Sequence, residues 1–168
     1  MDRAVSPSHR LAAVALGSNL GDRHAAIAFA IDRLSRILSE ISSSTIVETH
    51  PEGLSGDVLE DQPLYLNAVV AGTTALDARA LLEGLQDIEQ EFGRVRSLPG
   101  AARTLDVDLV LLGDAIVDEP DLQVPHPRFR NRFFVLGPLA EIAPDMRDPV
   151  TGLRVGELLQ RLLRDDTR

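Results

Sequence analysis

The sequence predicts an α+β fold because its hydrophobic residues follow two different periods in a regular order along the chain. Short runs of apolar and β-branched residues are typical of strands. Two longer segments with an apolar residue every three or four positions are typical of amphipathic helices. Their order is strand–helix–strand–strand–helix–strand, which is the split βαβ arrangement of ferredoxin-like folds. We therefore expect a ferredoxin-like β-α-β-β-α-β core with an extra hairpin and helices at its C-terminal end.

The first half of the chain supplies three elements of this core. The apolar run 11–16 predicts the first strand. Residues 23–38 carry apolar side chains at helical spacing, and Asp22 directly before them is the expected N-cap. A β-branched run at 44–49 predicts the second strand. The segment 51–63 contains glycine and proline, so we expect a loop there.

The second half completes the core. Residues 66–74 form an apolar, β-branched run that predicts a central strand, and residues 76–92 repeat the helical spacing. After a loop rich in arginine, glycine and proline, residues 104–112 predict the fourth strand. The expected C-terminal additions are a hairpin within 115–124, a helix near 133–142 and a last helix near 155–163.

The composition bounds the class of protein. The chain has 168 residues, 44% of them hydrophobic and 26% charged, which is typical of one globular domain spanning 1–168. Residues 1–10 and 165–168 are expected to fray. No apolar run approaches the roughly 20 residues that cross a bilayer and no secretory signal is visible, so we expect no membrane partner and a cytoplasmic location. The absence of cysteine excludes disulfides and thiolate chemistry, and the absence of a heptad pattern favours a monomer.

The charged residues point to a small anionic ligand. Seventeen basic residues, all of them arginine, stand against 26 acidic residues and give a net charge of −9. A chain without lysine cannot form a Walker A loop or a Schiff base. The negative charge argues against a nucleic-acid partner, which requires a basic face. Six of the arginines nevertheless gather in one stretch: Arg94, Arg96, Arg103, Arg128, Arg130 and Arg132. This local cluster suits a small polyanion.

Two aspartates on the fourth strand are the strongest candidates for chemistry. Asp106 and Asp108 flank Val107, so their side chains share one face of the strand, about 7 Å apart. In the simplest interpretation they face water opposite a buried row. The apolar run 109–112, however, suggests that both faces are covered nearby, and two like charges on a partly buried face require a cation or a proton. Mg²⁺ held by two carboxylates and substrate phosphates meets that requirement, and the nearby arginines would complete a polyphosphate site.

Several other polar and aromatic residues are weaker candidates. Gln86 and Glu89 share one face of the second helix, where a solvated polar flank is the default interpretation. Tyr65 and Asn67 alternate at the entry of the third strand. His126 lies between two prolines and could contact a phosphate, although turn histidines are common. Phe134 is one of only six aromatic residues, which makes it a core or site residue.

At the level of motifs the sequence resembles the 6-hydroxymethyl-7,8-dihydropterin pyrophosphokinases of folate biosynthesis, in order from about 13 to 144. The motifs that carry the resemblance are LGSNLGDR at 16–23, DQPLYLNAV at 61–69, IE at 88–89, GRVR at 93–96, RTLDVDL at 103–109, PHPR at 125–128 and RFFVL at 132–136. The RTLDVD and PHPR motifs are the most specific of these.

The resemblance implies transfer of pyrophosphate from ATP to the hydroxymethyl group of a reduced pterin, with release of AMP. It implies that Asp106 and Asp108 hold two Mg²⁺ ions and that Arg94 and Arg103 belong to a catalytic loop. It also implies that Phe134 stacks on the pterin and that Asn67 hydrogen-bonds its edge. The implied nucleotide-binding residues are Gln86, Glu89, Arg96, Arg103, His126 and Arg132, and the implied pterin-binding residues are Thr49, Tyr65, Asn67, Asp106 and Phe134.

The sequence also departs from the family pattern. Residues 100–103 stand where the family usually has a Trp-Gly-Pro-Arg motif, and the aromatic residue is missing here. His50 stands where a proline usually follows Thr49, and the loop after it is longer. Two alternatives therefore stay open: another Mg²⁺-dependent phosphotransferase or phosphohydrolase, and a non-catalytic ferredoxin-like protein that binds a pterin or an anion.

Overall fold

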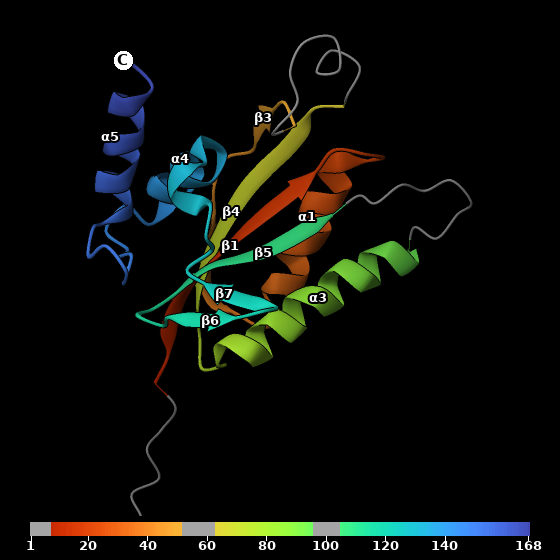
Figure 1. The fold of residues 1–168 in the computed structure, drawn as a ribbon. Coiled ribbons are helices and arrows are strands. Elements are labelled where there is room, and N and C mark those ends of the chain that lie inside the picture. Colours follow the sequence, from red (N-terminus) through yellow and green to blue (C-terminus); the bar gives the residue numbers. More distant parts are fainter. Residues whose placement is uncertain (1–7, 52–62, 96–104) are drawn as a thin grey trace, which may run out of the picture.

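The computed structural model describes residues 8–51, 63–95 and 105–168, without the side chains of residues 94 and 95, and its centre is an antiparallel sheet (Figure 1). The order of the strands is β2-β4-β1-β5, and β3 continues the outer edge beside β4. This order, with every neighbouring pair antiparallel, is the split βαβ arrangement, so the expected α+β fold class is confirmed. The strands are β1 (Arg10–Ser18), β2 (Ser39–Ser43), β3 (Val47–Thr49), β4 (Tyr65–Thr74) and β5 (Asp106–Leu112).

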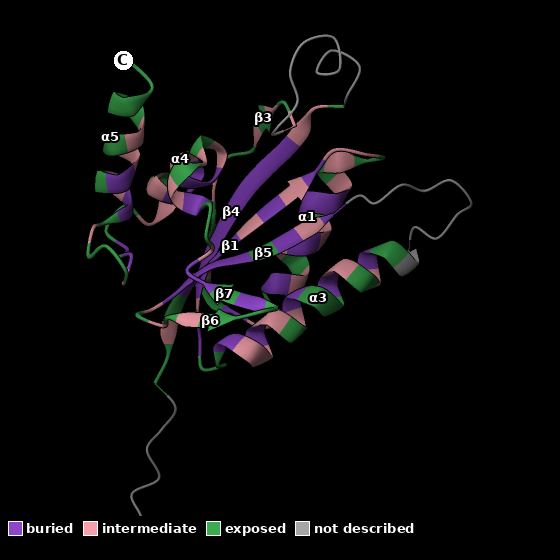
Figure 2. Ribbon diagram, in the orientation of Figure 1, coloured by how far each residue is buried: buried purple, intermediate pink, exposed green. Residues whose placement is uncertain are grey.

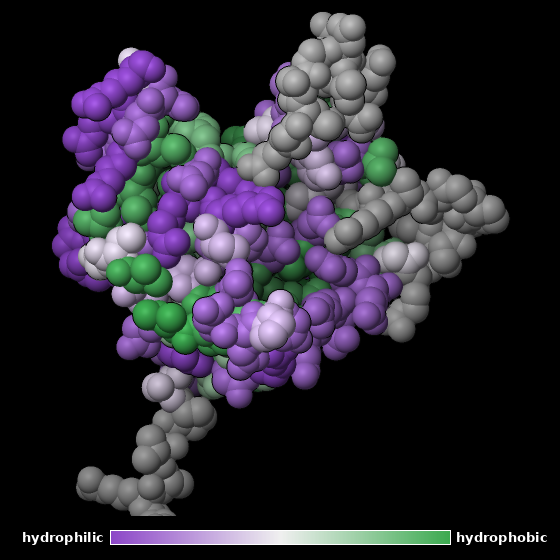
Figure 3. Space-filling model, viewed as in Figure 1, coloured by the Kyte–Doolittle hydropathy of each residue, from purple (hydrophilic) through white to green (hydrophobic). Residues whose placement is uncertain are grey.

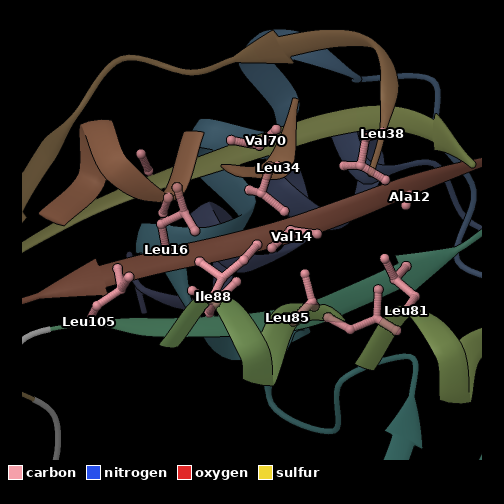
Figure 4. Packing of buried hydrophobic residues seen from close by; sticks show 14 of the residues in the cluster. Ala12, Val14, Leu16, Leu34, Leu38, Val70, Leu81, Leu85, Ile88 and Leu105 are labelled. Carbon is pink, nitrogen blue, oxygen red and sulfur yellow. The ribbon is translucent and has the colours of Figure 1, made fainter. Parts of the chain in front are cut away.

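Two helices, α1 (Arg23–Leu34) and α3 (Ala78–Val95), cover one face of the sheet. The side chain of Asp22 accepts a hydrogen bond from the backbone N–H of Ala25, which confirms Asp22 as the N-cap of α1. Figure 4 shows leucine and isoleucine side chains of α3 pointing at Val14 and Leu16 of β1. Each fully buried aliphatic side chain of this kind contributes about 1.5–3 kcal/mol.

The opposite face of the sheet is covered by α4 (Phe133–Ile142) and α5 (Val155–Asp165), which pack on part of it only. The hairpin of β6 (Val117–Glu119) and β7 (Leu122–Val124) lies beside α3 and β5. Figure 2 shows that the central strands are buried along nearly their whole length, as expected for a sheet with cover on both faces. None of the helices in the described part of the chain has the length and apolar character needed to cross a bilayer.

A bulge in β5 sets which side chains face α4 and α5. Ala13 pairs with Leu111 but the next residue, Val14, pairs with Leu109, so Val110 is an extra residue on β5. Val110 and Leu111 consequently both enter the core under α4 and α5. On the N-terminal side of the bulge, β5 keeps the ordinary alternation of side chains.

Several boundaries differ from the sequence expectation. Only residues 47–49 of the expected strand 44–49 form a strand, β3, and the additional strand β2 at 39–43 lies before the expected range. Between the two, Ser44 pairs with Val69 through its own N–H and its hydroxyl oxygen. Hydrophobic periodicity did not predict β2, because its residues are mostly polar and lie exposed at the sheet edge. The first helix ends at Leu34 rather than residue 38, and the second extends from Ala78 to Val95.

An ion pair fastens the segment before α4 to the turn before α5. Arg130, in a 3-10 helix (Phe129–Asn131), donates from Nε and NH2 to the two carboxylate oxygens of Asp148 at 2.6 and 2.9 Å. Asp148 is 0% exposed and also accepts hydrogen bonds from Val150 N and Thr151 Oγ1. Burial alone would raise the pKa of Asp148, but the hydrogen bonds from these three residues outweigh it and hold the pKa below the ordinary 3.8.

We expect Asp148→Asn to lower the free energy of unfolding by about 2–3 kcal/mol at pH 7, because Arg130 loses its counter-ion. The loss should stay below that of a fully buried pair, since the Arg130 side chain is 25% exposed. The folded-state pKa of Asp148 is depressed, so its contribution is complete above the unfolded pKa and disappears as the pH falls through the folded pKa. Urea unfolding at several pH values should therefore show that the difference in unfolding free energy between Asp148→Asn and the parent chain shrinks below about pH 4.

The matched control is Asp145→Asn, the same change at an exposed residue of the same connection between α4 and α5. It should leave the midpoint nearly unchanged. A difference between Asp148→Asn and the parent chain that is equally large at pH 7 and at pH 3 would contradict the role assigned to the Asp148 carboxylate.

Candidate active site

A cavity of about 620 Å³ opens on the face of the sheet that α4 and α5 leave partly free. Strands β1, β3, β4 and β5 and the segment that leads into α4 all contribute to its wall. The lining residues in the described part of the chain are Ala15, Leu16, Gly17, Thr49, His50, Pro51, Tyr65, Asn67, Ala68, Asp106, Asp108, Arg128, Arg132, Phe134 and Val135. Polar residues from distant parts of the sequence thus converge on one hollow.

The two carboxylates lie side by side in this cavity because of strand register. Asp106 is opposite Gly17 and Asp108 is opposite Ala15 on β1, so both side chains project from the same face. Their neighbours on β1 are the two smallest residue types, which leaves the floor beside each carboxylate open. A Cβ added at Gly17 would lie 3.6 Å from Asn67 Oδ1 and 3.7 Å from the Tyr65 ring. Val107, between the carboxylates, faces the opposite core and is 4% exposed.

An oriented amide stands on the neighbouring strand. Asn67 Nδ2 donates a hydrogen bond to Thr49 Oγ1 at 2.7 Å, and Asn67 is only 6% exposed. This bond fixes which end of the amide faces Thr49 and turns Oδ1 toward Gly17. Tyr65 and Phe134 supply aromatic surface to the same cavity. Such a wall suits a flat heterocycle with polar edges.

The cavity is lined by a pair of positively charged and a pair of negatively charged side chains. Arg128 and Arg132 line it together with Asp106 and Asp108. The guanidinium carbon of Arg132 lies 5.5 Å from the centroid of the Phe134 ring. No group of three or more His, Asp or Glu side chains that could hold a metal occurs among the described residues. The neighbouring carboxylates of Asp106 and Asp108 suit a hard cation that keeps substrate oxygens among its ligands.

Glu89 supports the carboxylate strand from outside the cavity. Its Oε1 accepts a hydrogen bond from the backbone N–H of Val107 at 2.7 Å. The N–H of His126 donates to Val110 O at 2.9 Å, and His126 Nδ1 accepts from the N–H of Arg128 at 3.1 Å. A side chain of α3 and a backbone group of the segment after β7 thus form hydrogen bonds with the backbone at the outer edge of β5.

The structure brings together seven of the residues selected from the sequence: Thr49, Tyr65, Asn67, Asp106, Asp108, Arg132 and Phe134. Gln86, Glu89 and His126 do not line the described cavity, and Gln86 is exposed on α3. Arg96 and Arg103 lie outside the described residues, as does the side chain of Arg94. Sequence reasoning gave no site role to Gly17 or His50, and it counted Arg128 in the arginine cluster without giving it a role of its own.

Comparison with known proteins gives the family. Residues 13–144 match the model of 7,8-dihydro-6-hydroxymethylpterin-pyrophosphokinase. This chain belongs to that family. A 2-amino-4-hydroxy-6-hydroxymethyldihydropteridine pyrophosphokinase of Pseudomonas aeruginosa is 43% identical over 148 residues, which are 87% of this chain and 88% of the relative. A relative of the same name from Bacillus subtilis is 39% identical over 145 residues, 85% and 84% of the two chains.

Two other similar proteins are much longer than this chain. The folic acid synthesis protein fol1 of Pneumocystis carinii is 36% identical over 156 residues, which are 92% of this chain but 20% of that protein. The crystal structure of a Plasmodium falciparum HPPK-DHPS triple mutant superimposes with a TM-score of 0.72 at 15% identity, covering 96% of this chain and 46% of that one. The fold is therefore shared with a unit of a larger protein.

We expect Glu89→Ala to lower the free energy of unfolding by about 1–3 kcal/mol, because the N–H of Val107 loses a charged acceptor beside a buried residue. Gln86→Ala is the matched control, one turn earlier on the same helix and exposed, and should change stability by less than about 0.5 kcal/mol. Chemical denaturation of the three proteins measures both values. Equal stability of the two variants would show that the bond to Val107 contributes nothing.

Proposed function

We propose that this chain transfers pyrophosphate from ATP to the hydroxymethyl group of 6-hydroxymethyl-7,8-dihydropterin, giving AMP and the pterin diphosphate. Family membership favours this activity over the two alternatives left open by the sequence. The observation that carries the proposal is one cavity with two sets of side chains. An oriented amide and aromatic rings suit a pterin, and paired carboxylates and arginines suit a metal–polyphosphate.

In this proposal the pterin lies against Tyr65, Asn67 and Phe134. The Phe134 ring stacks on the heterocycle, and Asn67 Oδ1 accepts a hydrogen bond from a ring-edge N–H. Thr49 holds the amide of Asn67 in the required orientation. Asp106, next to Gly17 on the same face, borders both the pterin and the phosphates.

Asp106 and Asp108 would hold Mg²⁺, and two ions are proposed from the family resemblance. When bound there, the metal would neutralise charge on the polyphosphate and stabilise the charge that develops during transfer. Arg132, which lines the same cavity, donates to phosphate oxygens. Gln86, Glu89, Arg96, Arg103 and His126 stay predicted nucleotide-binding residues, and Arg94 and Arg103 stay predicted residues of the catalytic loop.

The transfer step forms one bond and breaks one. The hydroxymethyl oxygen of the pterin attacks the β-phosphorus of ATP, and the bond from that phosphorus to the oxygen shared with the α-phosphate breaks. AMP leaves with this oxygen, and the hydroxyl proton is released to solvent. The protein contributes by aligning the two substrates and by matching the charge of the phosphates.

The proposal is tested by measuring AMP release from Mg-ATP with and without 6-hydroxymethyl-7,8-dihydropterin. We expect AMP only when the pterin is present. Hydrolysis of ATP that does not depend on the pterin would favour a phosphohydrolase. Pterin binding by calorimetry without AMP would favour a non-catalytic binding protein.

We expect Asp106→Asn and Asp108→Asn each to lower the rate of AMP formation by at least about 100-fold, since each removes a proposed metal ligand. The matched control is Asp114→Asn, the same change at an exposed aspartate that does not line the cavity. All three variants should keep the circular dichroism spectrum of the parent chain. Normal activity in both site variants would overturn the metal assignment.

The remaining expectations concern the state of the chain. A single domain, a monomer, the absence of nucleic-acid partners and a cytoplasmic location stay predictions. Sedimentation of the purified chain would measure the expected monomer directly.

A further inference from the structure

We propose that Arg128 binds the β- and γ-phosphates of the nucleotide, a role that rests on the proposed function and that the sequence did not single out. Three arginines, at 128, 130 and 132, occur within five residues of one another. The structure gives each of them a different environment, and only Arg128 combines an exposed position with a place on the cavity wall.

The other two arginines of this segment already have protein partners. Arg130 is engaged by both carboxylate oxygens of Asp148 and lies 4.7 Å from the centroid of the Phe129 ring. Arg132 lies against the Phe134 ring within the cavity. By contrast, no carboxylate in the described part of the chain forms an ion pair with the guanidinium of Arg128.

The backbone around Arg128 is fixed although its side chain is exposed. The N–H of Arg128 donates to His126 Nδ1 at 3.1 Å, and its carbonyl oxygen accepts from the N–H of Asn131 at 3.1 Å. The next side chain, Phe129, is 0% exposed in the core under α4 and α5. Only the side chain of Arg128 has to be ordered when a ligand binds, which reduces the entropy lost on binding.

The charges of the cavity indicate which ligand this side chain meets. The carboxylates of Asp106 and Asp108 share the cavity with Arg128 and attract cations. Once a divalent cation occupies them, the guanidinium faces an anion held by that cation, and a phosphate accepts two parallel hydrogen bonds from it. Tyr65 and Asn67 line the same cavity, so the phosphates that enter it are those passed to the pterin. AMP, the leaving group, does not contact Arg128 in this arrangement.

The test compares Arg128→Gln with Arg161→Gln, the same change at an exposed residue of α5, whose surface is largely hydrophilic in Figure 3. Calorimetry measures the binding of Mg-α,β-methylene-ATP, of AMP and of 6-hydroxymethyl-7,8-dihydropterin. We expect Arg128→Gln to bind the triphosphate analogue about 10- to 100-fold more weakly, as is typical for a lost charged hydrogen bond. AMP and pterin should bind as in the parent chain, and Arg128→Lys should recover part of the loss.

Two results would overturn the inference. The first is that Arg128→Gln binds the analogue as tightly as Arg161→Gln does, and the second is that it loses affinity for AMP by the same factor. If the parent chain forms AMP in a pterin-dependent way while either result holds, only the role of Arg128 fails. If the parent chain forms no AMP, the proposed function fails, and the role of Arg128 fails with it.

Discussion

Antiparallel pairing of β5 with β1 puts Asp106 over Gly17 and Asp108 over Ala15, and the remainder of the site depends on this register. Side chains alternate along a strand, so a shift of one residue would send both carboxylates into the leucine-rich core under α1 and α3. Such a shift would also bring Val107 into the cavity. Burying two unpaired carboxylates costs far more than any hydrogen bond of the ladder contributes. The hydrophobic core therefore selects the register, and the register creates the site.

The segment that leads into α4 depends on this arrangement as well. The bulge at Val110 turns two consecutive apolar side chains toward Phe129 and Leu136, which anchors α4 over one half of the sheet face and leaves the other half open. The ion pair of Arg130 with Asp148 then holds the backbone that carries the arginines of the cavity wall. On the far side, the carboxylate of Glu141 on α4 accepts hydrogen bonds from Thr45 N and Oγ1, which fastens α4 to the connection between β2 and β3.

The order of the core elements and the shared face of the aspartates were predictable from the sequence, because both depend on local periodicity. The edge strand β2 was not, since exposed polar residues such as Ser39 and Glu40 leave no hydrophobic period to detect. Asn67, Tyr65, Phe134 and Arg132 were only weak candidates from strand alternation and composition, and their proposed roles came from the family motifs. Arg128 could not be separated from Arg130 by residue type, because the difference between them is the presence of Asp148, 18 residues further along the chain. Glu89 stays a predicted nucleotide-binding residue, and nothing in the sequence indicated the hydrogen bond that its carboxylate accepts from the backbone of β5.

Tyr65 has one further consequence, for spectroscopy. The chain contains a single tyrosine and no tryptophan, and that tyrosine lies in the wall of the cavity. When the chain is excited at a wavelength that phenylalanine does not absorb, its near-ultraviolet emission therefore originates from this one residue, beside the proposed pterin position. A reduced pterin absorbs light in the range where tyrosine emits, so energy transfer would report its arrival in the unlabelled, unmodified chain.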